Sequence, residues 1–233
     1  MKLRLLADHP VLNFINTIDP REGPHRVEYL SGFADLVDWA RHGGILTGRN
    51  ARKIAVEGKC NSRVATRAFK RAIELREALY TIFVNVAARR PPSSDAMAQL
   101  VTAHRDAQAH GAFVRTGDRF QWVLPATPDF VHWRIAEDAI ELLQSTKLNR
   151  VKRCPGSGDC GWLFFDTSKN ATRRWCSMEG CGNRAKLRRF LRRQKKGPRQ
   201  PQRGLQPTRL PLRQQPLHIN PIHPVNPVSF RGR

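Results

Sequence analysis

Residues 154–181, CPGSGDCGWLFFDTSKNATRRWCSMEGC, hold four of the five cysteines of this 233-residue chain. They form two close pairs, C-x5-C and C-x4-C, separated by fifteen residues: Cys154, Cys160, Cys176 and Cys181. Such pairs are typical of tetrahedral zinc sites, because each supplies two thiolates from one turn and the insert brings the pairs together. No histidine lies between His132 and His218, so an all-cysteine site is the only local solution. The pattern predicts one structural Zn²⁺.

Other uses of four cysteines fit this pattern less well. A redox pair usually has the spacing C-x-x-C, which is absent from the chain. Disulfides are rare in a reducing compartment, whereas an iron–sulfur cluster held by four thiolates stays an alternative. Because all four positions are filled by protein, catalytic zinc is not expected. A module of about 40 residues also has too little core to fold without such a tether.

The compartment follows from the N-terminal sequence. The first apolar run is broken by Asp8, His9 and Pro10, and no small-residue cleavage site follows, so a signal peptide is not expected. No uncharged apolar stretch reaches the roughly 18 residues that a membrane span needs. We therefore expect a cytoplasmic protein with no membrane partner. The fifth cysteine, Cys60, lies in a polar stretch and is expected to be a surface thiol without an assigned role.

The positive charge of the chain is large and uneven. The formal net charge is +22 and the isoelectric point is near 11.2. Residues 151–233 contain 19 lysines and arginines but only three acids, and no acid follows Glu179. Such a field attracts polyanions, nucleic acid above all. The asymmetry predicts a basic binding module attached to a nearly balanced body.

Hydrophobic periodicity predicts a mostly helical body over residues 1–149, with one small β-hairpin. Helices are expected at residues 8–18 (capped by Asp8), 31–42, 65–89, 94–110 and 129–147. Residues 113–124, FVRTGDRFQWVL, alternate between apolar and polar around Gly117-Asp118, which is the pattern of a hairpin. The predicted fold class is thus mostly α, with a helical N-terminal domain followed by a small α+β finger.

The finger is predicted to span residues 150–196 and to be treble-clef-like. Trp162–Phe165 is expected to pair with Thr172–Trp175 as a hairpin between the cysteine pairs. A helix follows Cys181, and its predicted buried face is formed by Leu187, Phe190 and Leu191. Residues 197–233 carry eight prolines and no acid, so they are expected to form a disordered basic Pro-rich tail.

The stretch RRWCSMEGCGNRAK, with CGWLFFDTSKN just upstream, resembles the CGNR zinc-finger family of bacterial proteins. The resemblance covers about residues 150–193 and includes both cysteine pairs and the letters CGNR themselves, residues 181–184. Residues 1–148 resemble the helical ABATE domain on LNFINT (12–17) and LVDWARHGGIL (36–46), although many members have Asp where this chain has Asn13. The resemblance implies a stress-induced transcription regulator that binds DNA.

A run of basic residues after the last cysteine pair indicates what the finger binds. The predicted nucleic-acid contacts are Arg173, Arg174, Arg184, Lys186, Arg188, Arg189, Arg192 and Arg193. Because the arginine guanidinium forms bidentate hydrogen bonds with phosphates and with guanine edges, duplex DNA is the favoured partner, with RNA as the alternative. Arg184 has a second interpretation, in which it braces the metal site. Lys152, Arg153 and Arg174 could likewise balance the charge of four thiolates around the zinc.

The first helix of the body carries a polar stripe that suggests a ligand pocket. Its candidate residues are Asn13, Asn16, Thr17 and Arg21. They would orient a small-molecule effector, or instead form a buried network that ties the helix to a loop.

The chain has no Gly-rich phosphate loop, no paired acids at useful spacing and no His cluster, so an enzyme is not expected. The alternatives left open are an RNA- or ribosome-associated zinc protein, and an enzyme whose body acts while the finger only stabilises it. A homodimer would extend the DNA sequence that so small a finger can select.

Overall fold

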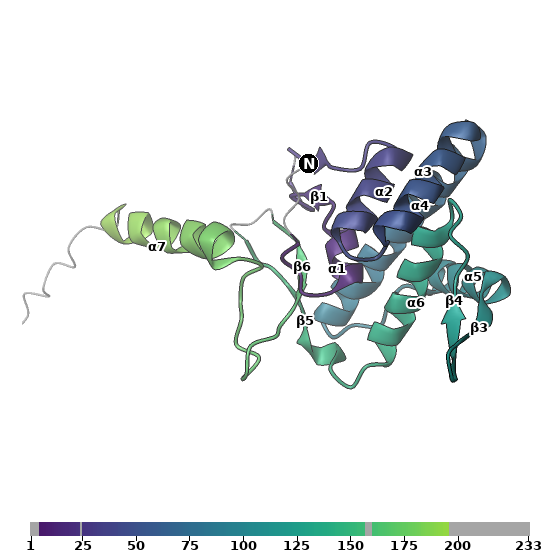
Figure 1. Cartoon of the computed structure of the whole chain (residues 1–233). Coiled ribbons are helices and arrows are strands. Elements are labelled where there is room, and N and C mark those ends of the chain that lie inside the picture. The colour runs from purple at the N-terminus through teal and green to yellow at the C-terminus, as the bar shows by residue number, and fades with distance from the viewer. Residues whose placement is uncertain (1–4, 24, 157–159, 196–233) are drawn as a thin grey trace, which may run out of the picture. The chain divides into compact units, whose positions relative to one another are not determined.

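The computed structural model describes residues 5–23, 25–156 and 160–195 (Figure 1). The predicted tail, residues 197–233, lies outside the described residues. Within the described part, six α-helices precede the finger: α1 (Pro10–Ile15), α2 (Phe33–His42), α3 (Gly48–Cys60), α4 (Ser62–Ala87), α5 (Ser94–His110) and α6 (Phe130–Gln144). None of the described helices is long and apolar enough to cross a membrane. The predicted fold class, mostly helical with small antiparallel strand pairs, is confirmed.

Helix α4 is the central element of the body. Its 26 residues contact α1, α2, α3, α5 and α6. Its inner stripe includes Ala72, Leu79, Ile82 and Phe83, none more than marginally exposed. A stripe this wide buries against several neighbours at once, which is why its periodicity is easy to recognise. As predicted, the helix ends just before a pair of prolines, which cannot continue it.

Two features of the helical body differ from the sequence predictions. Helix α3 was not predicted, because only Ala51, Ile54 and Gly58 are buried along its 13 residues and the periodicity is correspondingly weak. Helix α1 is capped by His9, whose Nδ1 accepts a hydrogen bond from Val11 N (3.3 Å), and not by Asp8. The backbone of Asp8 is left-handed (φ 56°) instead.

Three short antiparallel strand pairs complete the described structure: β1 (Ile18–Asp19) with β2 (Val27–Glu28), β3 (Ala112–Thr116) with β4 (Arg119–Val123), and β5 (Val151–Arg153) with β6 (Leu163–Phe165). The β3–β4 hairpin turns at Gly117-Asp118 as predicted, and Gly117 has the left-handed φ of 62° that such a turn requires. The β1–β2 pair was not predicted. Its strands of two residues are too short to show alternation.

The hairpin of the finger differs from the prediction. Strand β6 pairs with β5, which precedes the first cysteine, and not with residues 172–175. The connection between β5 and β6 therefore carries Cys154 and Cys160. Val151, Leu163 and Phe164 of this pair are buried. Because β5 lies against α4 and β6 against α1, packing on the body selects this pairing over the one closer in sequence.

The finger and the helical body share one hydrophobic core. The side-chain amide of Asn16, the residue that directly follows α1, forms two hydrogen bonds with the backbone of Leu163: Nδ2 donates to the carbonyl (2.7 Å), and Oδ1 accepts from the N–H (3.1 Å). Three further contacts join the halves: Phe165 N to Ala7 O, Arg21 N to Cys160 O, and Trp162 Nε1 to Ile18 O. Both sides of the predicted boundary at residues 149 and 150 thus pack into one compact unit, residues 1–195.

We predict that Asn16→Ala destabilises the protein by about 3 kcal/mol, because it leaves a buried N–H and a buried C=O of Leu163 without partners. Asn13→Ala, three residues earlier on α1, is the matched control. It removes one hydrogen bond, from Ala7 N to Oδ1 (3.0 Å), at a less buried position, and should cost about 1 kcal/mol. Urea unfolding followed by circular dichroism measures both. Equal losses for the two variants would contradict a specific role of Asn16 in holding β6.

Candidate metal centre and nucleic-acid interface

The four cysteines of the two pairs come together at one buried point. Cys154 directly follows β5, Cys160 precedes β6, Cys176 precedes the turn that leads into the last helix, and Cys181 lies within that turn. Their sulfur atoms all lie within 4.8 Å of one another, and no more than 5% of any of the four residues is exposed. Segments up to 27 positions apart in sequence therefore present their sulfurs to one space.

Glycines and short turns allow this convergence. Gly156 in the first loop has φ 51°, and a Cβ there would lie 2.4 Å from Cβ of Cys160. In the second pair, Ser177 Oγ accepts from Gly180 N (3.2 Å) and Ser177 O accepts from Gly182 N (3.0 Å), which winds Met178–Gly182 into one π-helical turn. The sequence between the cysteines of each pair is thus suited to a knuckle that points both sulfurs inward.

The sulfur geometry fits a tetrahedral metal ion. Four thiolates bound to one Zn²⁺ at about 2.3 Å lie about 3.8 Å apart along the edges of a tetrahedron. The separations are 3.8 Å between Cys160 Sγ and Cys176 Sγ, and 3.6 Å between Cys176 Sγ and Cys181 Sγ. Four buried sulfurs within 4.8 Å of one another can hold one metal ion, and a tetrahedral set of four thiolates suits zinc.

The protonation of the four thiols is strongly coupled. Hydrogen bonds from Cys160 and Cys176 lower the pKa of Cys154 to about 7. Contact with the other sulfurs raises the pKa of Cys160 and of Cys176 above the ordinary range, while the pKa of Cys181 is lowered. Four neighbouring thiolates repel one another, so all four can ionise together only beside a cation. This is the electrostatic condition of a metal site.

Basic and acidic side chains support the metal centre from outside. Nη2 of Arg184 donates to Cys181 Sγ (3.2 Å), which supports its interpretation as a brace for the site. Asp166, fully buried, accepts from Lys152 Nζ (2.6 Å) and from Ser168 Oγ (2.6 Å). Burial would raise the pKa of this carboxyl, but these hydrogen bonds prevail and lower the pKa to about 2. Asp166 is therefore ionised, and its carboxylate holds the loop between the two cysteine pairs in place.

The predicted contact Arg173 is used within the protein. Its guanidinium donates to Leu6 O (2.8 Å), Trp175 O (3.0 Å) and Cys176 O (2.5 Å), and it pairs with the carboxylate of Asp8. It therefore joins the N-terminal segment to the second cysteine pair. Arg174 differs, since it is exposed and lies 5.8 Å from the ring centre of Trp175.

Both basic and apolar side chains of the last helix, α7 (Asn183–Lys195), are exposed to solvent. The basic residues Lys186, Arg188, Arg189, Arg192 and Arg193 are all exposed, as predicted for a contact surface. The prediction that Leu187, Phe190 and Leu191 form a buried face is wrong, since they are 58%, 56% and 46% exposed. The core of the finger faces α1 and α4 through its strands, so α7 is packed mainly against the turn that precedes it.

The residues proposed for a ligand pocket on α1 have protein partners. Thr17 Oγ1 donates to Phe14 O (2.8 Å) and accepts from Arg76 Nη1 (2.9 Å). Arg21 donates twice to Glu77 (3.2 and 2.9 Å). Together with the contacts of Asn13 and Asn16, these bonds favour the alternative of a buried network, and a ligand pocket at these residues stays a prediction. Sequence reasoning missed Arg76, 2% exposed, although it stands in the apolar stripe of α4 between Ala72 and Leu79.

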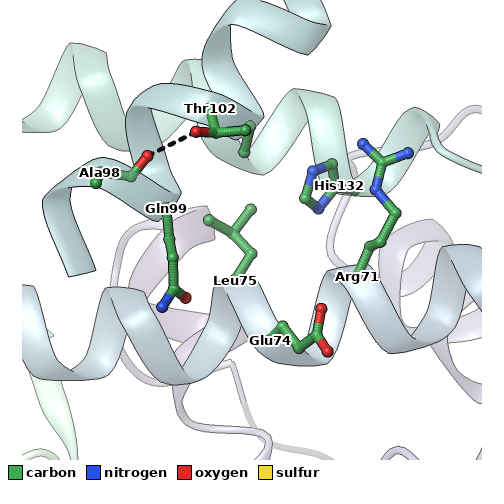
Figure 2. A pocket seen from close by; sticks show the side chains of 8 residues that line it. Arg71, Glu74, Leu75, Ala98, Gln99, Thr102 and His132 are labelled. Atoms are coloured by element: carbon green, nitrogen blue, oxygen red, sulfur yellow. Dashed lines mark hydrogen bonds between the residues drawn. The ribbon is translucent and has the colours of Figure 1, made fainter. Parts of the chain in front are cut away.

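A cavity of about 570 Å³ lies instead between α4, α5 and α6 (Figure 2). Arg71 and Glu74 of α4, Gln99 and Thr102 of α5, and His132 of α6 surround it together with Leu75. His132 is 7% exposed, and within the described residues no hydrogen bond partner is found for its Nδ1. A concave site with a few polar groups on an apolar wall has the character of a small-molecule site.

Comparison with known protein families places these observations in context. The four-cysteine knuckle and the helix after it define a zinc-finger protein, and residues 150–194 match the CGNR zinc finger. Residues 8–146 match the ABATE family, described as "Putative stress-induced transcription regulator". No curated protein is similar enough to this chain to count as a match. Because the ABATE match spans more than half of the chain, the chain belongs to that family, with a CGNR zinc finger following the family's domain.

We predict that Cys176→Ser loses the bound metal while far-UV circular dichroism keeps most of its helical signal, because most residues of the shared hydrophobic core lie on α1 to α6. Cys60→Ser is the matched control, since Cys60 is exposed at the end of α3 and far from the cluster in sequence. Zinc content per chain, measured by atomic emission after dialysis, is the readout. A full complement of zinc in Cys176→Ser would exclude the four-cysteine cluster as the metal site.

We also predict that His132 makes the folded state sensitive to acid. Burial, assisted by the Arg71 guanidinium, lowers the pKa of His132 from 6.5 to about 4. In the unfolded chain His132 is protonated as the pH falls below about 6.5, whereas in the folded chain it is protonated only near pH 4. Stability therefore falls as pH decreases through this window, by about 3 kcal/mol at most.

His132→Gln should remove this part of the pH dependence, whereas His42→Gln, at an exposed position on α2, should not. Urea unfolding at a series of pH values from 7 to 4 gives the free energy of unfolding of each variant. Any acid-induced loss of metal is common to the variants and cancels in the difference between their free energies. Parallel curves for the wild type and His132→Gln would show that His132 is not held neutral.

Proposed function

We propose that the protein is a zinc-dependent, DNA-binding transcription regulator in which α7 contacts duplex DNA. The observation that carries the proposal is the exposure of the basic residues of α7, on a helix that follows directly from the metal knuckle. No acid follows Glu179 in the sequence, so α7 contains no acidic residue. A single helix fits the major groove, where arginines reach both phosphates and guanine edges.

The metal has a structural role in this proposal. One Zn²⁺ bound by all four cysteines would leave no open position for a substrate, which is the pattern of structural sites. The ion would join the β5–β6 loop to the turn before α7, and so set the direction in which α7 leaves the finger. On the same ground, we propose that the protein is not an enzyme.

The body supplies the regulatory part of the proposed function. The cavity between α4, α5 and α6 supports the binding of a small effector, since it is lined by an apolar wall, a buried histidine and the polar ends of Gln99 and Thr102. Helix α4, which forms one wall of this cavity, also contacts β5 of the finger. A ligand that shifts α4 would therefore act on the element that positions the metal knuckle.

The quaternary state and location belong to the same proposal. The exposed apolar stripe of α7, residues Leu187, Phe190 and Leu191, supports a homodimer, because a second copy would bury it. Light scattering of the purified chain measures this directly. A regulator that depends on reduced thiolates and contacts DNA would act in the bacterial cytoplasm.

We predict that Lys186→Ala and Arg189→Ala each reduce the slope of log K against log salt for duplex DNA by about one, if each side chain neutralises one phosphate. Fluorescence anisotropy of a labelled random duplex, across a potassium chloride series with the full chain, is the measurement. Arg105→Ala, which removes an exposed arginine from α5, is the matched control and should leave the slope unchanged. Unchanged slopes for both α7 variants would remove this helix from the footprint.

Two further arms separate the alternatives. Duplex RNA of equal length, titrated at equal salt, would be preferred if the protein is an RNA- or ribosome-associated factor. Cys176→Ser should abolish DNA binding, because without the metal α7 loses its fixed attachment to the finger. If this variant binds DNA with an unchanged salt slope, residues 196–233 are the binding segment and the finger is not.

A further inference from the structure

A second cavity, of about 470 Å³, lies where the end of α4 meets the finger. Five cationic side chains from three segments line it: Arg90 after α4, Lys152 and Arg153 of β5, and Arg173 and Arg174 before the second cysteine pair. No carboxylate belongs to the wall among the residues that the structure describes. The apolar part of the lining comes from Val84, Ala87 and Phe164. This composition differs from that of the cavity in the body, which includes Glu74.

Three of the five cations have carboxylate partners just outside the wall. The pairs are Lys152 with Asp166, Arg153 with Glu22, and Arg173 with Asp8. Within residues 5–23, 25–156 and 160–195, no carboxylate is paired with Arg90 or with Arg174. The charges of these two arginines therefore remain uncompensated, whereas those of the other three cations are balanced by their carboxylate partners.

The backbone holds Arg90 at this pocket. Arg89 adopts a left-handed conformation (φ 56°), and its N–H donates to Val86 O (2.9 Å), while the N–H of Arg90 donates to Asn85 O (2.8 Å). These two bonds are the C-terminal cap of α4. The carbonyl end of a helix disfavours anions. Here the cap occupies two of the last carbonyls, the oxygens of Asn85 and Val86, with hydrogen bonds from the backbone.

We propose that this cavity binds a phosphate group through Arg90 and Arg174. Two uncompensated guanidinium groups match the charge of a terminal phosphate dianion, or of two successive phosphates of a DNA strand, and guanidinium binds phosphate oxygens in bidentate fashion. The guanidinium carbon of Arg174 lies 5.8 Å from the ring centre of Trp175, so its N–H edges can still reach a ligand. The volume lies within the range of about 300–1,000 Å³ of small-molecule sites and exceeds what one phosphate fills. The group is therefore carried by a larger molecule.

Two sources present such a group: a phosphorylated small molecule, or the backbone of DNA bound beside α7. Only the second source depends on the function proposed above. In either case the site joins the two halves of the chain, because Arg90 follows the main helix of the body and Arg174 belongs to the finger.

The test is isothermal titration of the zinc-loaded full chain with inorganic pyrophosphate, at constant ionic strength set with chloride. Arg90→Ala and Arg174→Ala should each weaken binding about tenfold or more, since each removes a charged hydrogen-bonding partner. Arg105→Ala is the control. Arg105 lies far from the basic cavity. The residue next to it, Asp106, pairs with Arg71, and Arg71 is sixteen residues, or roughly 24 Å along α4, from Ala87 in the cavity wall. Zinc content after the titration shows that pyrophosphate has not removed the metal.

The salt slope of DNA binding by Arg90→Ala distinguishes the sources. Pyrophosphate binding that depends on Arg90, with an unchanged DNA slope, assigns the site to a free phosphorylated molecule. A DNA slope reduced by about one, without pyrophosphate binding, assigns it to the DNA backbone. If neither quantity responds to Arg90, or if Arg105→Ala has the same effect, the proposal is overturned. Should the wild type not bind DNA at all, the pyrophosphate titration alone decides.

Discussion

The convergence of four cysteine sulfurs is the constraint on which the C-terminal third of this structure depends. Thiolates within 4.8 Å of one another repel unless a cation lies among them. The strand pair β5–β6, the knuckle before α7 and the start of α7 all owe their relative positions to this point. The buried Asp166 and the guanidinium of Arg184 support it from either side, one holding a loop and the other a sulfur.

The second constraint is the joint between the finger and the body. Asn16 pairs with Leu163 through both amide atoms, in the manner of a neighbouring strand. Arg173 reaches back to Leu6 and Asp8 from the other side of the finger. Family comparison separates the chain near residue 148, yet the hydrophobic core crosses that position. Helix α4 lines the cavity of the body near Arg71 and the basic cavity near Ala87, so one rigid element borders both candidate ligand sites.

Much of the fold could be predicted where the signal was local. The long stripe of α4, the Gly117-Asp118 turn and the cysteine spacings each encode their structure within a few residues. Helix α3 was not predicted, because it buries few apolar side chains and the N-cap residue Thr47 by itself is a weak indication of a helix. The apolar stripe of α7 was recognised as helical, but periodicity cannot tell a face that meets the core from one that meets solvent.

The sequence by itself determined the donor set of the metal site, the helical class of the body and the basic character of the last helix, because each depends on residue type and spacing. Only the tertiary structure decided which strand pairs with β6, which arginines are occupied inside the protein, and that Arg90 and Arg174 line the same cavity. Those outcomes depend on contacts between residues far apart in sequence. Their energies come from burial and from hydrogen bonds such as that of Asn16 to Leu163, which no local pattern records.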